Sequence, residues 1–263
     1  MTIDRNHRSH LPAGMPKNVA GTFAKGDANT VDDVTPPITI PLRTVKGLAR
    51  LLYRMGRTFD GLNTSRLATE EFLRTGNPDV IGSRDDYALL CDLKDASSYV
   101  LNTDWDTTRF DLDWFKGINA AMTRTAAMLP GVLRDSENVI VGTKYGTYTP
   151  TVPDPIILDS WMEAGASDKG DPLDAASRLF ARLAKAQPFG DGNKRSALLA
   201  ANGLLVRAGS PLMLTVPVEE PERTGFNDLL GAWYMHDDDR IIVWLADWNR
   251  MGPETGIRIS PGA

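Results

Sequence analysis

One short stretch, QPFGDGNKR at residues 187–195, combines residue types that could do chemistry. Gly190 and Gly192 flank Asp191 and permit backbone conformations that other residues resist, so N–H groups of this turn can approach a ligand closely. A helical apolar pattern begins directly after the turn, near residue 193. The free N–H groups and the positive dipole at the start of a helix attract anions. The stretch therefore predicts a phosphate-binding turn.

Two cations at the start of this helix, Lys194 and Arg195, strengthen the prediction. Each residue also has a structural interpretation. Asp191 can cap the second helix, Asn193 can close the turn, and the two cations can form a solvated first helical turn. Taken singly, these residues leave the structural interpretation open, and only the complete string is specific.

The head of the stretch is occupied by glutamine, whose amide cannot accept a proton near neutral pH. The preceding helical pattern places the apolar residues Ala176, Leu179, Phe180 and Leu183 on one face, and the same spacing continues to Gln187. Pro188 cannot continue the hydrogen bonding of the helix, so the helix must end there. We therefore expect the Gln187 side chain to point inward, beside the turn.

The sequence as a whole predicts an all-α protein with one short β-hairpin. Helical periodicity is expected from residue 44 and again over 83–101, from 111, over 156–164, 171–186, 194–208 and 226–249. Ser83 is the candidate cap of the helix over 83–101, and the helix from 111 carries Trp114, Ile118 and Met122 until LPGV (129–132) ends it. The segment NVIVGTKYGTYTP (138–150) is rich in β-branched residues and glycine, which indicates a hairpin. The segment PLMLTV (211–216) predicts a short extended piece. We expect a flexible arm over 1–40, one domain over 41–250, divided into 41–105 and 106–250, and a tail over 251–263.

Composition excludes several classes of protein. A net charge of −5 over 263 residues gives no basic surface for nucleic acid. The single cysteine, Cys91, cannot form a disulfide framework within the chain. No apolar run is long enough to cross a membrane, and the first residues lack the apolar segment of a signal peptide. The sequence favours a cytoplasmic protein without membrane or nucleic-acid partners, with an exported effector that carries a non-apolar signal as the alternative.

The motif QPFGDGNKR resembles the signature of the Fic/Doc (Fido) family, His-Pro-Phe-x-Asp/Glu-Gly-Asn-Gly/Lys-Arg, and departs from it only at the histidine. Upstream, PGVLR (130–134) is similar to the segment that precedes the family's β-hairpin flap, and VIVGTKYGTYTP stands where that flap is expected. The resemblance covers about residues 110–248, is looser over 45–101 and is absent from the first 40. It implies a Fic-type helical bundle with a hairpin flap.

The resemblance also implies a reaction. Members of the family transfer AMP, or in the Doc branch a phosphoryl group, from a nucleotide to a hydroxyl of a target protein. The motif histidine, which acts as the base, corresponds to Gln187. ATP or another nucleotide with Mg²⁺ is the implied cofactor, and Asp191 is the implied magnesium ligand.

The remaining site residues are carried over from the same motif. The implied nucleotide-binding residues are Gly190, Gly192, Asn193, Lys194 and Arg195. The implied flap residues, which would align a segment of the target as an added strand, are Thr143, Lys144, Tyr145 and Gly146. Lys194 and Leu198 stand where AMP-transferring members commonly have glycine and a second arginine, and this pattern resembles the Doc branch.

Some Fic proteins carry a self-inhibitory helix whose glutamate pairs with that second arginine. The nearest match here is GRTFDG (56–61), which offers Asp60 in place of the glutamate, while Leu198 replaces the arginine. We therefore expect that the inhibitory ion pair is lost in this chain. The alternative is that this segment is only a turn between helices.

The missing base decides the expected function. Loss of a general base costs about 10²- to 10⁴-fold in rate. His7 and His10 lie in the arm, and His236 lies beside acids in YMHDDD, so no histidine is an evident replacement. The sequence therefore favours a catalytically impaired, nucleotide-binding member. An active transferase that works without the histidine, or an active enzyme in which Gln187 was introduced, remains an alternative.

Overall fold

The computed structural model describes residues 43–125 and 129–252, which belong to one compact unit, Pro37–Ala263. The predicted arm over 1–40 and residues 253–263 of the predicted tail lie outside the described residues.

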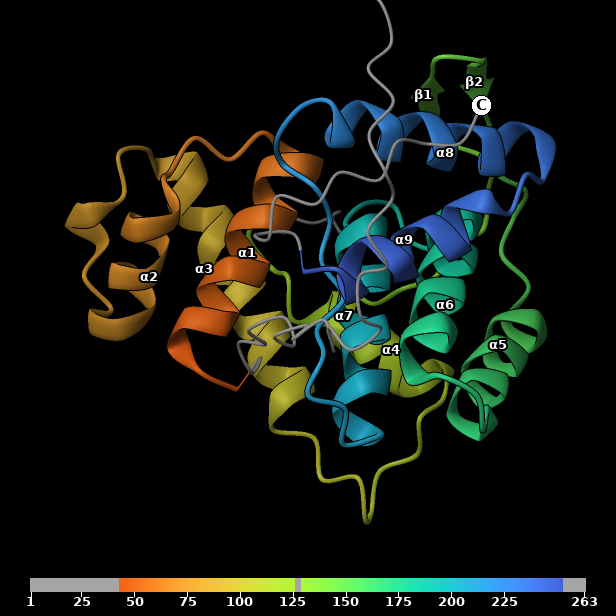
Figure 1. Ribbon diagram of the computed structural model, residues 1–263, viewed down its shortest axis with the longest axis horizontal. Coiled ribbons are helices and arrows are strands. Elements are labelled where there is room, and N and C mark those ends of the chain that lie inside the picture. The colour runs from red at the N-terminus through yellow and green to blue at the C-terminus, as the bar shows by residue number, and fades with distance from the viewer. Residues whose placement is uncertain (1–42, 126–128, 253–263) are drawn as a thin grey trace, which may run out of the picture. The chain divides into compact units, whose positions relative to one another are not determined.

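Helices dominate the described part of the chain, as predicted (Figure 1). The helices are α1 (Val45–Asp60), α2 (Arg66–Thr75), α3 (Arg84–Leu101), α4 (Leu112–Ala120), α5 (Pro155–Ser167), α6 (Pro172–Ala186), α7 (Asn193–Arg207), α8 (Glu222–His236) and α9 (Arg240–Arg250), with a 3-10 turn η1 at Pro78–Val80. One antiparallel hairpin, β1 (Val141–Thr143) and β2 (Gly146–Tyr148), pairs Val141 with Tyr148. The all-α prediction with one hairpin is confirmed.

Side-chain caps set the starts of most helices. The predicted cap Ser83 accepts a hydrogen bond from the N–H of Asp86 at 3.0 Å, and α3 begins directly after it. Thr44 accepts from the N–H of Gly47 in the same way before α1. A hydroxyl at this position satisfies one of the N–H groups that a helix start leaves without a partner.

The helix that follows the motif, α7, lies at the centre of the bundle. It packs against α1, α3, α4 and α6 (Figure 1), and 12 of its 15 residues are buried. Gly203 permits the contact with α4, because a Cβ atom there would lie 2.3 Å from the indole of Trp114. A helix surrounded on all sides holds its first turn in a fixed place, which is what a binding turn requires.

The prediction of one continuous helix over 226–249 is wrong. The structure places two helices there, α8 and α9, separated at Asp237, which has the left-handed φ of 56°. The Nε–H of Arg240 then donates to the two carboxylate oxygens of Asp238, at 2.9 and 3.0 Å. The three successive aspartates after His236 thus form a turn rather than a continuing helix.

The helix predicted from residue 111 ends earlier than expected, at Ala120, although Met122 is fully buried as predicted. The buried carboxylate of Asp92 accepts hydrogen bonds from the N–H groups of Arg124 and Thr125. These bonds hold the chain in a turn that a longer helix could not make.

Two further elements differ from the expected pattern. Helix α2 was not among the predicted elements, although Ser65 and Gly76 cap its two ends. The predicted extended piece at 211–216 has no strand partner among the described residues, and Asn202 instead binds the backbone N–H and carbonyl of Leu214, at 3.0 and 2.9 Å. None of the described helices has both the length and the apolar character that spanning a membrane requires.

Candidate nucleotide-binding site

The motif forms a tight turn between α6 and α7. Its closure depends on Asn193, whose side chain accepts a hydrogen bond from the N–H of Phe189 at 2.7 Å and donates one to the carbonyl of the same residue at 2.9 Å. The Phe189 side chain is fully buried and packs against Phe115 of α4. The turn is therefore anchored to the core at one point and closed on itself at another.

Gln187 caps the end of α6, with the left-handed φ of 45° and 5% exposure. Its backbone N–H donates to the carbonyl of Leu183, and its side-chain Nε2 donates to the carbonyl of Ala184 at 2.6 Å. The amide therefore satisfies the last carbonyls of its own helix. The inward direction predicted for this side chain is confirmed.

The start of α7 offers N–H groups without a side-chain cap. Gly192, at the N-cap, has a φ of 72°, and a Cβ atom there would lie 3.0 Å from Nδ2 of Asn119. Glycine satisfies both the backbone conformation and the close approach. The first turn of α7 therefore keeps the features that bind phosphate at helix starts.

A cavity of about 450 Å³ lies over this turn and brings the predicted site residues together. Its lining includes Asp60 of α1, residues 138–142 before and within β1, and the motif residues Gln187, Gly190, Asp191, Gly192, Asn193, Lys194 and Arg195. Residues from three distant parts of the chain thus meet at one site. The volume lies in the range of ordinary small-ligand sites.

Arg195 is the buried cation of the site, at 3% exposure. Its guanidinium donates to the hydroxyl of Thr125 at 2.8 Å and lies 3.4 Å from carboxylate oxygens of both Asp191 and Asp60. A phosphate that binds Arg195 must therefore displace or rearrange an acid that already neutralises it.

Asp60 reaches the motif, but through a different partner from the one the resemblance implies. Leu198, at the position of the family's second arginine, is fully buried in the core, and the Asp60 carboxylate pairs with Arg195 at 3.4 Å. Burial raises the pKa of Asp60, and the charge of Arg195 opposes that rise. The expectation that this inhibitory-like segment has lost its contact with the motif needs one correction, because the shortened acid still contacts Arg195, for which phosphate binding stays a prediction.

Removal of the Asp60 carboxylate is expected to strengthen nucleotide binding. In Asp60→Ala, phosphate no longer competes with this acid for Arg195, and we expect the Kd for Mg·ATP to fall by about three- to tenfold, the effect of one partly exposed ion pair. Calorimetric titration measures this change. Asp79→Ala in η1 is the control and leaves the Kd unchanged; an equal or weaker affinity in Asp60→Ala would show that the carboxylate does not oppose the nucleotide.

Lys194 lies between two cavities. It lines the motif cavity and a neighbouring cavity of about 350 Å³ formed by the flap and α8. Its Nζ lies 5.4 Å from the centre of the Phe59 ring, and burial lowers its pKa, against the effect of Asp60. A ligand that spans the two cavities would pass this cation.

The flap lies against α8 (Figure 1). Lys144 forms an ion pair with Asp228 of α8, and the Tyr145 ring meets His236 edge-on at 5.1 Å. Thr143 and Lys144 line the neighbouring cavity, and Thr143 pairs with Gly146 in the hairpin. The four predicted flap residues therefore lie together beside the site, and their role in target binding stays a prediction.

The site fits magnesium in one specific manner. The Asp191 side chain is 57% exposed and lines the motif cavity, while no cluster of three His, Cys, Asp or Glu side chains that could hold a metal occurs within residues 43–125 and 129–252. Mg²⁺ is commonly bound by one or two carboxylates together with substrate phosphates and water. A single exposed carboxylate beside a phosphate-binding turn meets that requirement.

The sequence did not reveal the residues that support the turn. Asn119 is fully buried, donates to the carbonyl of Asp191 at 3.0 Å and to Ser196 at 3.1 Å, and accepts from the N–H of Gly131 at 2.8 Å. Arg134 donates to the carbonyl of Gln187 at 2.7 Å. The PGVLR segment signalled the arginine but not its partner, and a lone asparagine in an apolar helix gave no signal.

Comparison with known proteins agrees with this geometry. Residues 109–205 match the Fic/DOC family. A 79-residue stretch is 30% identical to Protein adenylyltransferase fic-1 of Caenorhabditis briggsae, covering 28% of this chain and 15% of that relative. The chain thus corresponds to a small part of the relative's length.

Solved structures share the fold. A Fic domain containing signaling protein from Bacteroides thetaiotaomicron superposes with a TM-score of 0.65 at 19% identity, covering 79% of this chain and 85% of that one. Fic-1 from C. elegans superposes with a TM-score of 0.61 at 18% identity, covering 80% of this chain and 62% of that one. At these identities the likeness concerns the fold alone. The chain therefore contains a region that matches the Fic/DOC family, at residues 109–205, and has the fold of Fic-domain structures.

Proposed function

We propose that this protein binds a magnesium nucleotide in the motif cavity and is impaired in transferring AMP or a phosphoryl group to a protein hydroxyl. The relative from C. briggsae is named a protein adenylyltransferase, and the residues that would hold nucleotide phosphates are present here. The single observation that carries the impairment is Gln187, a residue without a basic group at the position of the family's base.

The phosphates would lie at the start of α7, on its free N–H groups, with Arg195 and Lys194 as counter-charges. Asp191 would hold Mg²⁺, which supplies charge neutralisation to the phosphates when it is bound. In this arrangement Asp60 and phosphate compete for Arg195, so the chain's own acid limits affinity.

The target hydroxyl would approach Gln187 along the flap. The side-chain oxygen of Gln187 can accept a hydrogen bond and orient a hydroxyl, but it cannot remove the proton. Transfer of a phosphoryl group through a loose transition state depends mainly on positioning and charge neutralisation. The missing base should therefore slow phosphoryl transfer less than it slows AMP transfer. Binding of the target therefore does not require turnover.

The test uses ATP labelled separately at the α and γ phosphates, incubated with the protein, Mg²⁺ and cell lysate. Wild-type protein is expected to label targets no more than the doubly substituted control Asp191→Ala, Arg195→Ala. Labelling above that control would overturn the impairment and favour the active transferase. Label from the α position alone would then identify AMP transfer, and label from γ alone would identify phosphoryl transfer.

Nucleotide binding itself is expected to depend on Arg195. Removal of its guanidinium in Arg195→Ala is expected to weaken Mg·ATP binding by about 10- to 100-fold, the contribution of a charge-assisted hydrogen bond. The ATP-dependent rise of Tm measures the change, since a ligand stabilises only the state that binds it. Arg178→Ala on α6, whose guanidinium pairs with Asp168, is the matched control and should keep the full rise; the same rise in Arg195→Ala would contradict the assignment.

A further inference from the structure

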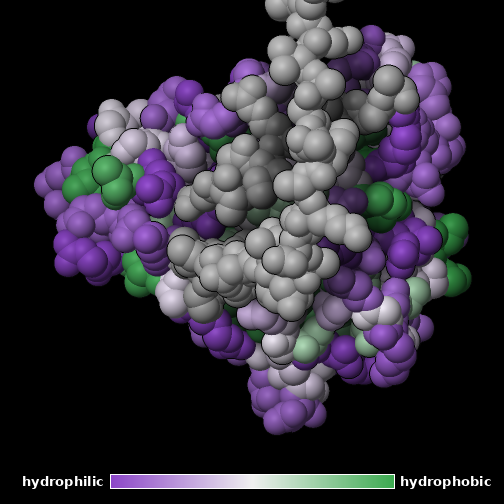
Figure 2. Space-filling model, in the orientation of Figure 1, coloured by the Kyte–Doolittle hydropathy of each residue, from purple (hydrophilic) through white to green (hydrophobic). Residues whose placement is uncertain are grey.

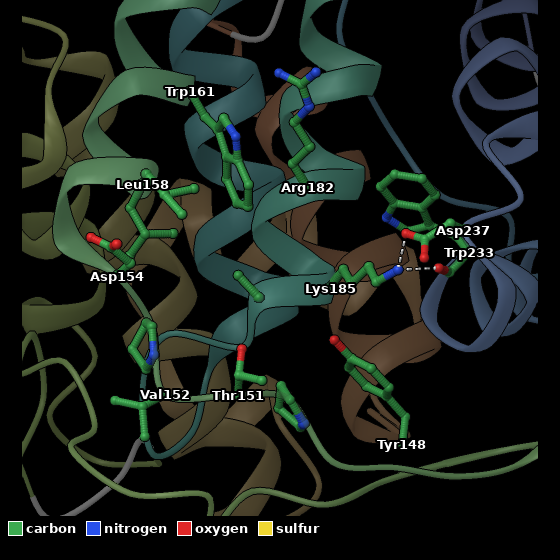
Figure 3. Close-up of a pocket in the computed structure, with 14 residues that line it drawn as sticks. Tyr148, Thr151, Val152, Asp154, Leu158, Trp161, Arg182, Lys185, Trp233 and Asp237 are labelled. Atoms are coloured by element: carbon green, nitrogen blue, oxygen red, sulfur yellow. Dashed lines mark hydrogen bonds and ion pairs between the residues drawn. The ribbon is translucent and has the colours of Figure 1, made fainter.

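A second cavity, of about 480 Å³, lies outside the motif (Figure 3). Its walls come from the end of β2 and the segment after it (148–154), from α5, from α6 and from the end of α8, and no residue of 187–195 lines it. Its size is typical of small-ligand sites. The cavity is therefore separate from the proposed nucleotide site.

Aromatic rings form much of its wall. Figure 3 shows Trp161 on one side of the cavity and Tyr148 and Trp233 on the other. Apolar side chains continue onto the surface at the start of α5, where Ile156 is 80% and Ile157 is 46% exposed, and Figure 2 shows hydrophobic side chains at that edge. Flat rings bury a large area at a small entropy cost, so such walls favour a planar aromatic ligand.

Three of the four charged side chains at this cavity already have partners. The Lys185 ammonium pairs with Asp237 and donates to the carbonyl of Trp233 at 2.8 Å (Figure 3). The Asp154 carboxylate caps α5 by accepting from the N–H of Ile156 at 2.8 Å. The charge of Asp237 is therefore already balanced, and no ion pair joins Asp154 to Arg182 among the described residues.

The fourth, Arg182, lies beside Trp161, with its guanidinium carbon 5.9 Å from the ring centre, and has neither a hydrogen bond nor an ion pair within the described part of the chain. Burial lowers the pKa of Arg182, and the nearby charge of Arg178 lowers it further. Arg178, by contrast, is paired with Asp168 at 3.0 Å. A partly buried cation without an acid is costly, and an anion would remove that cost.

We propose that this cavity binds a small aromatic carboxylate, with its ring between Trp161 and the rings of Tyr148 and Trp233 and its carboxylate on the guanidinium of Arg182. Planar guanidinium groups bind carboxylates through two parallel hydrogen bonds. The proposal needs neither a nucleotide nor a target protein, so it stands independently of the proposed function.

The test compares two probes of the same shape, indole-3-acetate and indole-3-acetamide, titrated into the full chain and followed by ligand-observed NMR. The acid is expected to bind with a Kd below about 1 mM and at least about tenfold more tightly than the amide, because a hydrogen bond to a charged group contributes about this much. Arg182→Met keeps the aliphatic stem and should abolish the difference between the probes. Arg178→Met, one turn away on α6, should preserve it.

Three results would overturn the proposal. They are absence of saturable binding of the acid at 10 mM, equal affinity for acid and amide in the wild type, and an unchanged preference in Arg182→Met. Trp161→Ala gives a second readout, because it should weaken both probes while circular dichroism confirms the helical content. A fourth result would also refute the proposal: displacement of the acid by excess ATP would place the acid in the motif cavity instead.

Discussion

Replacement of Gln187 by histidine is expected to raise the transfer of label from ATP to protein hydroxyls by about 10²- to 10⁴-fold, the usual contribution of a general base. The other groups that the proposed reaction requires lie beside this position, since Asp191, Lys194 and Arg195 line the same cavity. Under the proposed function, only the proton acceptor is missing. A single substitution should therefore restore most of what the motif lacks.

The local structure can accept the imidazole. Residue 187 has a φ of 45°, and histidine is among the residues that tolerate this left-handed region more often than most. The Tyr234 hydroxyl lies buried beside the Gln187 side chain, without a hydrogen bond of normal geometry to any described residue. Burial raises the pKa of Tyr234, so its hydroxyl stays protonated and can orient an imidazole but cannot act as the base.

The measurement is the rate of target labelling by Gln187→His relative to wild type, at saturating ATP. Gln187→Asn is the matched control, because asparagine also tolerates the left-handed region but is not a base. It should stay at the wild-type level. If Gln187→His binds ATP but gains no activity, a second defect besides the missing base must exist, and the account of the impairment would fail.

Substitution of Arg134 is expected to have the largest effect on folding stability. Its buried guanidinium donates to the carbonyls of Gln187 and Ser136, each at 2.7 Å, to that of Ala186 at 3.2 Å, and to that of Thr151. It therefore ties the segments on both sides of the flap to the end of α6. Each hydrogen bond from a charged group contributes about 1.5–3 kcal/mol.

In Arg134→Met, the apolar stem is kept and these donors are lost, so we expect the free energy of unfolding to fall by about 3 kcal/mol. Urea denaturation measures it. Arg109→Met is the control, because that side chain is 77% exposed and its ion pair with Glu163 should contribute less than about 1 kcal/mol. A loss below about 1 kcal/mol in Arg134→Met would show that water replaces the guanidinium without cost.

The sequence predicted those parts of the fold that depend on local signals. The cap at Ser83, the hairpin around Gly146 and the inward direction of Gln187 each follow from neighbouring residues, and the structure confirms them. The division of 222–250 into two helices was missed, because apolar spacing continues across the break. The left-handed backbone of Asp237 and the turn held by Asp238 and Arg240 separate the two helices.

The features of the site that the sequence did not predict depend on contacts between residues far apart in the chain. Asn119 lies 72 residues before Asp191, and Asp60 lies more than 130 residues before Arg195, so no local pattern joins them. The resemblance pointed to Asp60 and to the loss of its family partner at Leu198, but not to the contact of Asp60 with Arg195. The family signature could identify which residues line the motif cavity, but not which of them already neutralise one another.

Under the proposed function, the motif still binds nucleotide although the family's base is missing. The most direct test is a calorimetric titration of the wild-type protein with ATP in the presence of Mg²⁺. We predict a saturable heat with one site per chain, lost when Mg²⁺ is omitted or when Asp191 is replaced by alanine. The absence of any saturable heat at millimolar ATP would contradict the claim.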